Sequence, residues 1–173
     1  KVAFHEGDVE KVEEFPKADV LIGCYPCTGF SLAARRRWKN SEVRDLRSNT
    51  GNFLYEEFLR ALCQVQPRYL FVENVRGMVT ADDGWFFKQQ LQGFKALGYR
   101  VRFADLHASN FGVAQSRRRV FIVGVRRDVR RFRYKFPVGD YGLGRRRPTQ
   151  LLRDVIGHLP DWPIGDYYDG VFH

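Results

Sequence analysis

Three short, continuous apolar runs constrain the fold of this chain more than any other feature. They occupy residues 20–23, 69–72 and 120–125, with the sequences Val-Leu-Ile-Gly, Tyr-Leu-Phe-Val and Val-Phe-Ile-Val-Gly-Val. Continuous apolar runs of this length are typical of strands that are covered on both faces. Residues 99–106 alternate between apolar and polar side chains, which predicts a fourth strand.

Two segments between these runs have the periodicity of amphipathic helices. Their apolar residues recur every three or four positions: Leu54, Phe58, Leu62 and Val65 in the first, and Phe87, Leu91, Phe94 and Leu97 in the second. Pro67 ends the first pattern, and Gly98 suits the C-cap of the second. Strands that alternate with helices predict an α/β fold, with a parallel-type sheet and helices on both of its faces. Ligands of such sheets gather at the carboxyl ends of the strands.

The character of the chain changes near residue 128. Six basic residues lie between Arg126 and Lys135, and a run of three arginines follows at residues 145–147. We therefore predict a core over residues 1–128 and a basic extension over residues 129–173. One short helix is expected in the extension, over residues 151–156.

Composition limits the classes of function. Lysine and arginine number 29 against 20 acidic residues, a formal net charge of +9, so the surface should attract polyanions such as nucleic acid. The odd count of three cysteines favours a reducing compartment, and we expect a cytoplasmic protein. No apolar run approaches the roughly 20 residues that span a bilayer, so we expect no membrane contact.

Cys27 follows the first apolar run within the sequence Tyr-Pro-Cys-Thr-Gly-Phe-Ser, where a loop would present a nucleophile. A helix beginning nearby would favour the thiolate. A buried structural cysteine is the alternative that this segment alone leaves open. Cys24 and Cys27 form a C-x-x-C pair, which could indicate a redox pair or half of a zinc site, but no second Cys/His pair stands at ligand spacing. We therefore expect no metal.

Polar residues also follow or enter the other two apolar runs. Glu73 and Asn74 come directly after the second run, where the alternative is a solvated loop or a helix cap. The segment Gln-Ser-Arg-Arg-Arg, residues 115–119, enters the third run, and strand alternation sends Arg117 and Arg119 to one face and Arg118 to the other. Two arginines on one face can clamp a phosphate or a base edge, although a basic solvated edge is also possible.

The ordered motifs Pro-Cys-x-Gly-Phe-Ser, Glu-Asn-Val and Gln-x-Arg-x-Arg together resemble the DNA cytosine-5 methyltransferases. The resemblance covers nearly the whole chain. It implies a partial Rossmann-like sheet of the class I S-adenosylmethionine-dependent methyltransferases. It also implies methyl transfer from S-adenosylmethionine to carbon 5 of a flipped-out cytosine in double-stranded DNA, within a bacterial restriction-modification system.

The resemblance assigns four residues to catalysis. It implies that Cys27 attacks carbon 6 of the cytosine and that Glu73 contacts N3 and the exocyclic amine, with a proton given to N3. It implies that Arg119 contacts the target base and that Arg117 lies near the phosphates, whereas Arg118 should be less critical.

Further residues are assigned supporting or cofactor-binding roles by the same resemblance. Asn74 and Gln115 would brace the loops of the active site. Asp8 would bind the adenine amino group of the cofactor, and Pro26 and Leu54 would make further cofactor contacts. Leu54 can equally be a core residue of its helix.

The chain also departs from the family pattern. Tyr25 stands where a second proline is usual, Thr28 where glutamine is usual and Ala114 where proline is usual. The glycine-rich cofactor loop and the target-recognition domain are absent from this sequence. We expect the extension to lead towards that domain, and the missing motifs to lie on flanking residues or on a second polypeptide.

Two other interpretations remain at this point. One is a noncatalytic nucleic-acid-binding remnant of the same fold. The other is a tRNA cytosine-5 methyltransferase, because the catalytic motifs of the two classes overlap.

Overall fold

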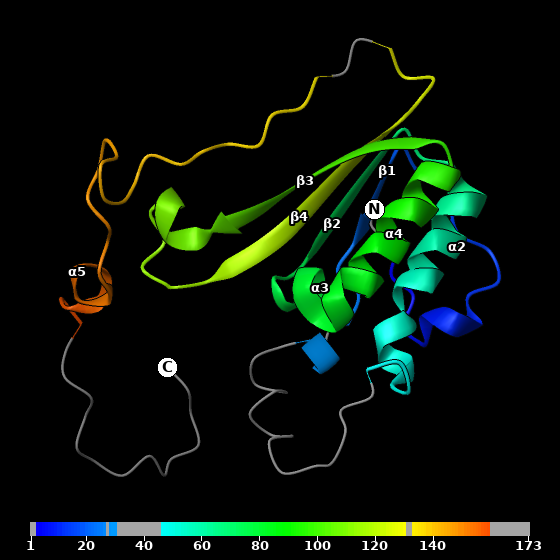
Figure 1. The fold of residues 1–173 in the computed structure, drawn as a ribbon, viewed down its shortest axis with the longest axis horizontal. Helices are drawn as coiled ribbons and strands as arrows, with labels where there is room; N and C mark the ends of the chain where they lie inside the picture. Colours follow the sequence, from blue (N-terminus) through cyan, green and yellow to red (C-terminus); the bar gives the residue numbers. More distant parts are fainter. Residues whose placement is uncertain (1–2, 27, 31–45, 131–132, 160–173) are drawn as a thin grey trace. The chain divides into compact units, whose positions relative to one another are not determined.

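The computed structural model describes residues 3–26, 28–30, 46–130 and 133–159. The chain divides into two compact units. The first comprises Lys1–Leu106 and Arg118–Pro137, and the second comprises His107–Arg117 and Val138–His173. The sheet and the helices that cover it belong to the first unit (Figure 1).

Among the described residues, four strands form one sheet in the order β1-β2-β4-β3. Their bounds are β1 (Val20–Gly23), β2 (Tyr69–Val75), β3 (Tyr99–His107) and β4 (Arg118–Arg126). The strands lie where the sequence predicted them. β1 pairs with β2 in parallel, and β2 pairs with β4 in antiparallel orientation.

The expectation of a parallel-type sheet is wrong for β4, which runs against β2. The physical reason is the connection between β3 and β4. It contains one 3-10 turn, η5 (Ala108–Phe111), whereas a parallel crossover needs about a dozen residues or more and usually a helix. As a consequence, the first residues of β4 lie beside the last residues of β2, with Arg119 opposite Val75.

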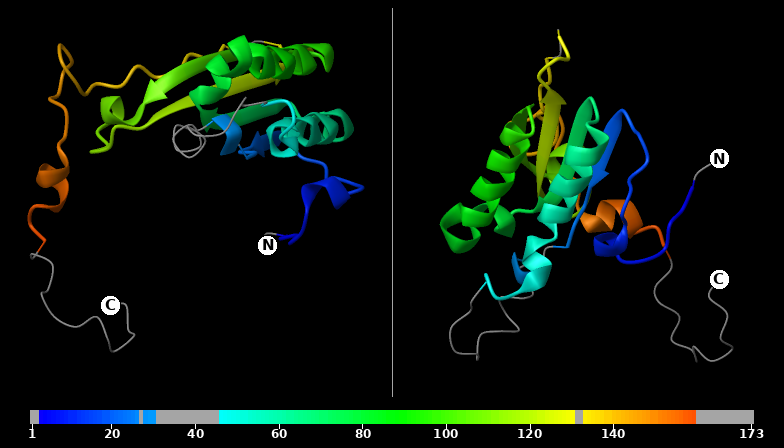
Figure 2. Two further views of the ribbon diagram at one scale, coloured as in Figure 1. Left: turned by 60° about the horizontal axis from the view of Figure 1, so that its bottom comes forward. Right: turned by 90° about the vertical axis from the view of Figure 1, so that its right-hand side faces the viewer.

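The two long helices, α2 (Tyr55–Val65) and α4 (Trp85–Ala96), pack against the same face of the sheet (Figure 2). The α/β fold predicted from the sequence is confirmed. In the part of the chain that the structure describes, the two long helices cover one face, whereas the sequence predicted helices on both. The opposite face of β1 carries Val20 and Ile22, whose exposed fractions are 49% and 69%.

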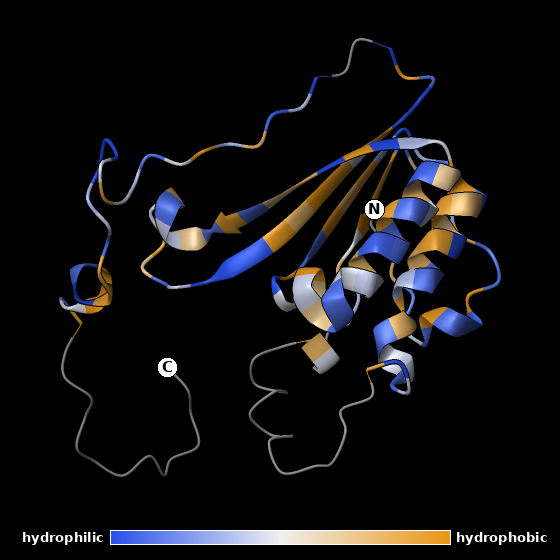
Figure 3. Ribbon diagram, in the orientation of Figure 1, coloured by the Kyte–Doolittle hydropathy of each residue, from blue (hydrophilic) through white to orange (hydrophobic). Residues whose placement is uncertain are grey.

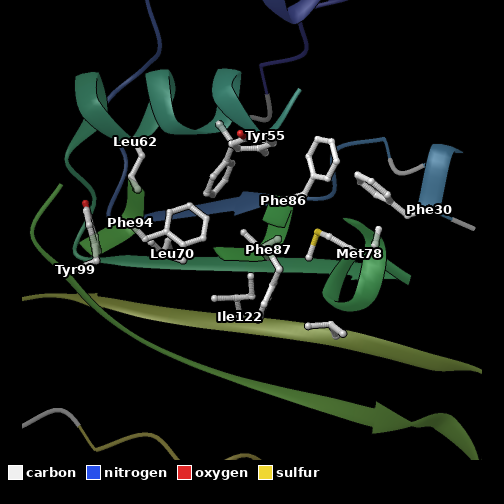
Figure 4. Close-up of a cluster of buried hydrophobic side chains, with 14 residues drawn as sticks. Phe30, Tyr55, Leu62, Leu70, Met78, Phe86, Phe87, Phe94, Tyr99 and Ile122 are labelled. Atoms are coloured by element: carbon white, nitrogen blue, oxygen red, sulfur yellow. The ribbon is translucent and has the colours of Figure 1, made fainter. Parts of the chain in front are cut away.

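The core lies between these helices and the sheet (Figure 4). Leu62 of α2 and Phe86 and Phe94 of α4 are fully buried, and they meet Leu70 of β2 and Ile122 of β4. Burial of one such side chain contributes about 1.5–3 kcal/mol relative to leaving it exposed. Figure 3 shows the matching hydropathy pattern, with apolar strands in orange and the basic start of β4 in blue.

The N-terminal segment is fastened to α2 from outside the core. The Arg60 guanidinium donates to the Val9 carbonyl at 2.9 Å and lies over the Phe15 ring, 4.9 Å from its centroid. The Gln64 side-chain amide donates to the Glu13 carbonyl at 3.1 Å. These contacts hold the short turn η1 (Val9–Lys11), which Asp8 caps by accepting a hydrogen bond from the Glu10 amide.

The second unit is built from turns and one short helix. The Tyr141 amide donates to the Asn110 carbonyl at 3.1 Å, and the Arg147 amide donates to the Asp140 carbonyl at 2.8 Å. The Arg147 guanidinium also donates to the Tyr141 hydroxyl. α5 (Leu152–Ile156) forms where the sequence predicted a helix. Across the described part of the chain, no helix has both the length and the apolar character to cross a membrane.

Candidate active site

Glu73 lies at the carboxyl end of β2, and strand register brings Cys24 next to it. Gly23 is paired with Val72 in the parallel β1–β2 ladder, so Cys24, the first residue after β1, lies beside Glu73 of β2. The Cys24 thiol donates to Oε2 of Glu73, with 2.8 Å between sulfur and oxygen. A thiol and a carboxyl group therefore meet where ligands of α/β sheets bind.

Arg119 reaches the same carboxylate from β4. In the antiparallel β2–β4 ladder Glu73 faces Phe121 and Val75 faces Arg119, so the Arg119 side chain is a diagonal neighbour of Glu73 on one face. Its Nε lies 2.9 Å from Oε1 of Glu73, and each side chain is 24% exposed. Its Nη1 donates to the Arg118 carbonyl at 2.8 Å. Each oxygen of Glu73 thus has its own donor.

The segment that precedes Cys27 is anchored through Tyr25 to α4 and to β2. The Tyr25 hydroxyl donates to Oε1 of the buried Gln90 on α4, and the Tyr25 ring packs 5.8 Å from that of Phe58. The buried Asn74 side chain donates to the Tyr25 carbonyl at 3.3 Å. Burial raises the pKa of Tyr25 well above its ordinary value, with smaller contributions from Tyr55 and Cys24.

The segment that follows Cys27 is anchored in the hydrophobic core by Phe30. η2 (Thr28–Phe30) ends at the buried Phe30, whose ring centroid lies 5.0 Å from that of Phe86. A Cβ added at Gly77, the first residue of α3 (Gly77–Thr80), would overlap the Phe30 carbonyl oxygen, so glycine permits this close approach. Cys27 itself lies outside the described residues, and its role as the nucleophile stays a prediction.

Arg118 points away from Glu73 and binds a different carboxylate. Asp105 of β3 lies 3.0 Å from Nη2 of Arg118 and 3.2 Å from Nε of Arg76. Arg118 and Arg119 therefore make separate ion pairs, as strand alternation predicted. The Arg76–Asp105–Arg118 cluster was not predicted, because its three residues come from separate segments of the chain and share no local pattern.

Arg117 and Gln115 belong to the second unit. The Arg117 carbonyl accepts a hydrogen bond from the Ala108 amide at 2.8 Å, and the Gln115 carbonyl accepts one from the Arg117 amide at 3.0 Å. In the same unit, His107 Nδ1 and the Ser109 hydroxyl are 2.7 Å apart. The roles of Arg117 and Gln115 towards DNA stay predictions.

The three residues predicted to bind the cofactor have suitable chemistry at separate places on the first unit. Asp8 is an exposed carboxylate on the segment held by α2, Pro26 is exposed in the loop after β1, and Leu54 is half-buried immediately before α2. One exposed acceptor and two apolar side chains fit an adenine, which offers an amino donor and an apolar ring. Their cofactor contacts stay predictions.

Sequence reasoning missed the contact of Cys24 with Glu73, because Cys24 was considered only as part of C-x-x-C. A signal was present in the sequence. Cys24 is the first residue after the apolar run at 20–23, and Glu73 is the first residue after the run at 69–72.

Comparison with known proteins gives consistent relatives. The family model described as C-5 cytosine-specific DNA methylase matches residues 1–159. The Type II methyltransferase M.BspRI of Lysinibacillus sphaericus is 42% identical over 172 residues, which are 99% of this chain and 38% of that protein. The Type II methyltransferase M.BsuRI of Bacillus subtilis is 41% identical over 97% of this chain and 36% of that protein.

A solved structure, described as a DNA modification methyltransferase encoded within a prophage of E. coli, has a TM-score of 0.62. It is 21% identical and matches 90% of this chain and 42% of its own, which shows a common fold. The chain therefore spans about two fifths of the length of these relatives. Because the family model matches residues 1–159 and the two Type II methyltransferases are more than 40% identical over nearly the whole chain, this chain belongs to the C-5 cytosine-specific DNA methylase family.

Proposed function

We propose that the complete protein carrying this chain methylates carbon 5 of cytosine in double-stranded DNA, within a bacterial restriction-modification system. The observation that carries the proposal is the carboxylate of Glu73, held by Cys24 and Arg119 at the carboxyl end of β2. The loop that contains Cys27 leaves the neighbouring strand at the same edge of the sheet. The names of the two bacterial relatives, both Type II methyltransferases, support the biological setting.

The proposed reaction begins with the flipped-out cytosine beside Cys27 and Glu73. The Cys27 thiolate forms a bond to carbon 6, the electron pair of the C5–C6 double bond moves to the C4–C5 bond, and the pair of the C4–N3 double bond moves to N3. N3 takes its proton from Glu73, which must enter this step as the carboxylic acid, having taken up a proton from solvent. Carbon 5 of the resulting enamine is then nucleophilic. S-adenosylmethionine, when bound, supplies the methyl group that carbon 5 takes.

The second half of the reaction restores the aromatic ring. A base removes the proton from carbon 5, its electron pair re-forms the C5–C6 double bond, and the sulfur–carbon bond breaks to release the Cys27 thiolate. N3 returns its proton to Glu73. Glu73 therefore moves one proton out and back, and its contact with N3 must replace part of the bonding that Cys24 and Arg119 now provide.

Arg119 has two tasks in this proposal. Its Nε holds Oε1 of Glu73, and the rest of its planar guanidinium can donate to the edge of the flipped base. An arginine that serves the base, and not the phosphates, adds little to the counterion release that makes DNA binding salt-dependent. This separates its expected effects from those of Arg117, which we propose near the phosphates.

S-adenosylmethionine is proposed as the cofactor, with Asp8, Pro26 and Leu54 as residues that would hold its adenosine part. Asp8 already accepts a hydrogen bond from the Glu10 amide through Oδ1, which fixes the direction of the carboxylate. A carboxylate has about four acceptor sites on two oxygens, so Asp8 can also accept from an amino group.

Covalent trapping tests the proposal. The complete protein, S-adenosylmethionine and duplex DNA containing 5-fluorocytosine should give a complex that survives denaturation. The fluorine at carbon 5 stands where the proton would be, and a base cannot remove it, so Cys27 is not released. Cys27→Ala should give no complex while keeping nearly all DNA affinity, since the thiol makes no phosphate contact. A wild-type protein that binds DNA normally but forms no adduct would refute the enzyme. An adduct with fluorinated tRNA in place of DNA would make it a tRNA methyltransferase.

A further inference from the structure

We infer that Cys24 is a second functional thiol of this site, a positioning residue that orients the Glu73 carboxyl group for its contact with cytosine. The inference rests on the proposed function, since Glu73 is the residue through which Cys24 would act. It differs from the role of Cys27, because the sulfur of Cys24 forms no bond to the base.

The need for a positioning group follows from the chemistry of the glutamate side chain. The last torsion of Glu is a bond between sp³ and sp² carbons, whose preferences are broad, so the side chain alone does not fix the plane of its carboxyl group. Contact with N3 and the exocyclic amine of cytosine requires one defined plane. External donors must therefore supply the orientation.

Two donors meet this need from opposite sides of β2. Arg119 of β4 holds Oε1, and Cys24 after β1 holds Oε2. With one contact the carboxyl group can still turn about that contact, whereas two contacts on different oxygens define its plane. Cys24 thereby complements Arg119, and neither can replace the other.

The position of Cys24 is itself fixed by the fold. It follows directly on β1, whose last residue Gly23 is paired with Val72. The next residue, Tyr25, is anchored to Gln90 by its hydroxyl and to Asn74 by its carbonyl. Because Gly23 and Tyr25 on either side are both held by hydrogen bonds, the thiol of Cys24 stays close to Glu73. The fold itself therefore maintains the contact with the carboxylate.

The contact also predicts a property that can be measured without catalysis. A thiolate beside a carboxylate is disfavoured by like charge, and the thiolate is the form that reacts with alkylating agents. Glu73→Gln removes the negative charge and should speed alkylation of Cys24 by iodoacetamide at fixed pH. Peptide mapping by mass spectrometry, in a Cys27→Ser background, would report the rate at Cys24 alone.

The kinetic test uses three variants of the complete protein: Cys24→Ala, Cys24→Ser and, as a matched control, Cys63→Ser. Cys63 is an exposed cysteine of α2 outside the site, so its variant should match wild type. Cys24→Ala should lower kcat roughly three- to tenfold, the range expected for one lost hydrogen bond, with little change in KM for DNA. Cys24→Ser keeps a donor and should recover most of the loss.

The outcomes separate the inference from the function on which it rests. Equal kcat for wild type, Cys24→Ala and Cys24→Ser would overturn the positioning role, and so would an alanine defect that serine fails to relieve. If the wild-type protein methylates DNA but Glu73→Gln leaves the alkylation rate of Cys24 unchanged, the positioning role would also be overturned. Glu73-dependent alkylation in a wild-type protein that fails the trapping assay would instead overturn the enzyme, and with it the catalytic role of Cys24, while the contact itself would stand.

Discussion

Tyr25→Phe removes one hydroxyl group and tests whether the loop before Cys27 is anchored in the core. The hydroxyl donates to Oε1 of Gln90, a residue that is 1% exposed. The phenylalanine ring can keep the packing against Phe58, so the substitution isolates the hydrogen bond. Because Gln90 is buried, water cannot easily replace the lost donor.

The expected cost follows from this burial. A buried acceptor that loses its partner costs about 1–3 kcal/mol, and removal of the buried hydroxyl returns part of that, so we expect unfolding to become easier by about 1–2 kcal/mol. Gln90→Leu removes the other partner. If the bond is the reason for the loss, the double variant Tyr25→Phe/Gln90→Leu should cost about 1 kcal/mol less than the sum of the two single variants.

Urea denaturation of the complete protein, followed by circular dichroism, measures these differences through the transition midpoint at constant slope. Cys63→Ser serves as the control, with an expected change within about 0.5 kcal/mol for an exposed position. A Tyr25→Phe variant as stable as the control, or a double variant whose cost equals the sum, would refute the anchoring of this loop by Gln90.

Three further outcomes are expected. Arg119→Ala should lower turnover at least tenfold through Glu73 while the salt dependence of DNA binding changes little, whereas a clearly smaller slope of log affinity against log salt would identify a phosphate contact. Burial raises the pKa of Tyr99 to about 12, above the value of about 10 in unfolded chains. The stability this provides is complete below about pH 10 and is lost as pH rises towards 12, and Tyr99→Phe should flatten that loss in alkaline denaturation curves. Gly77→Ala should lower the free energy of unfolding by about 1–3 kcal/mol and slow adduct formation, because the added methyl group displaces Phe30. An adduct rate equal to that of wild type would show that Phe30 does not position Cys27.

The strands and helices could be predicted from the sequence because their signals are local. Apolar runs at β1, β2 and β4, and the three- to four-residue spacing in α2 and α4, reflect which side chains must be buried against the sheet. The motif residues Glu73 and Arg119 could be identified for a related reason. Their residue types and their positions at strand ends are properties of short segments.

The direction of β4 could not be predicted in this way. Apolar runs are alike for strands with parallel and antiparallel neighbours, and the alternation of strands with helices favoured a parallel-type sheet. That expectation holds for β1 and β2 but not for β4. The error concerns the site directly. In a parallel arrangement the first residues of β4 would lie at the opposite edge from the end of β2, and Arg119 could not reach Glu73.

The sequence by itself determined where the secondary structure elements lie and which residue types carry the chemistry, since both depend on neighbours along the chain. The tertiary structure decided which of those residues meet. The insertion of β4 antiparallel between β2 and β3 brings Arg119 to Glu73, and the β1–β2 register brings Cys24 to the other oxygen of the same carboxylate. Contacts across strands depend on direction and register, which are fixed when the whole sheet packs against its helices.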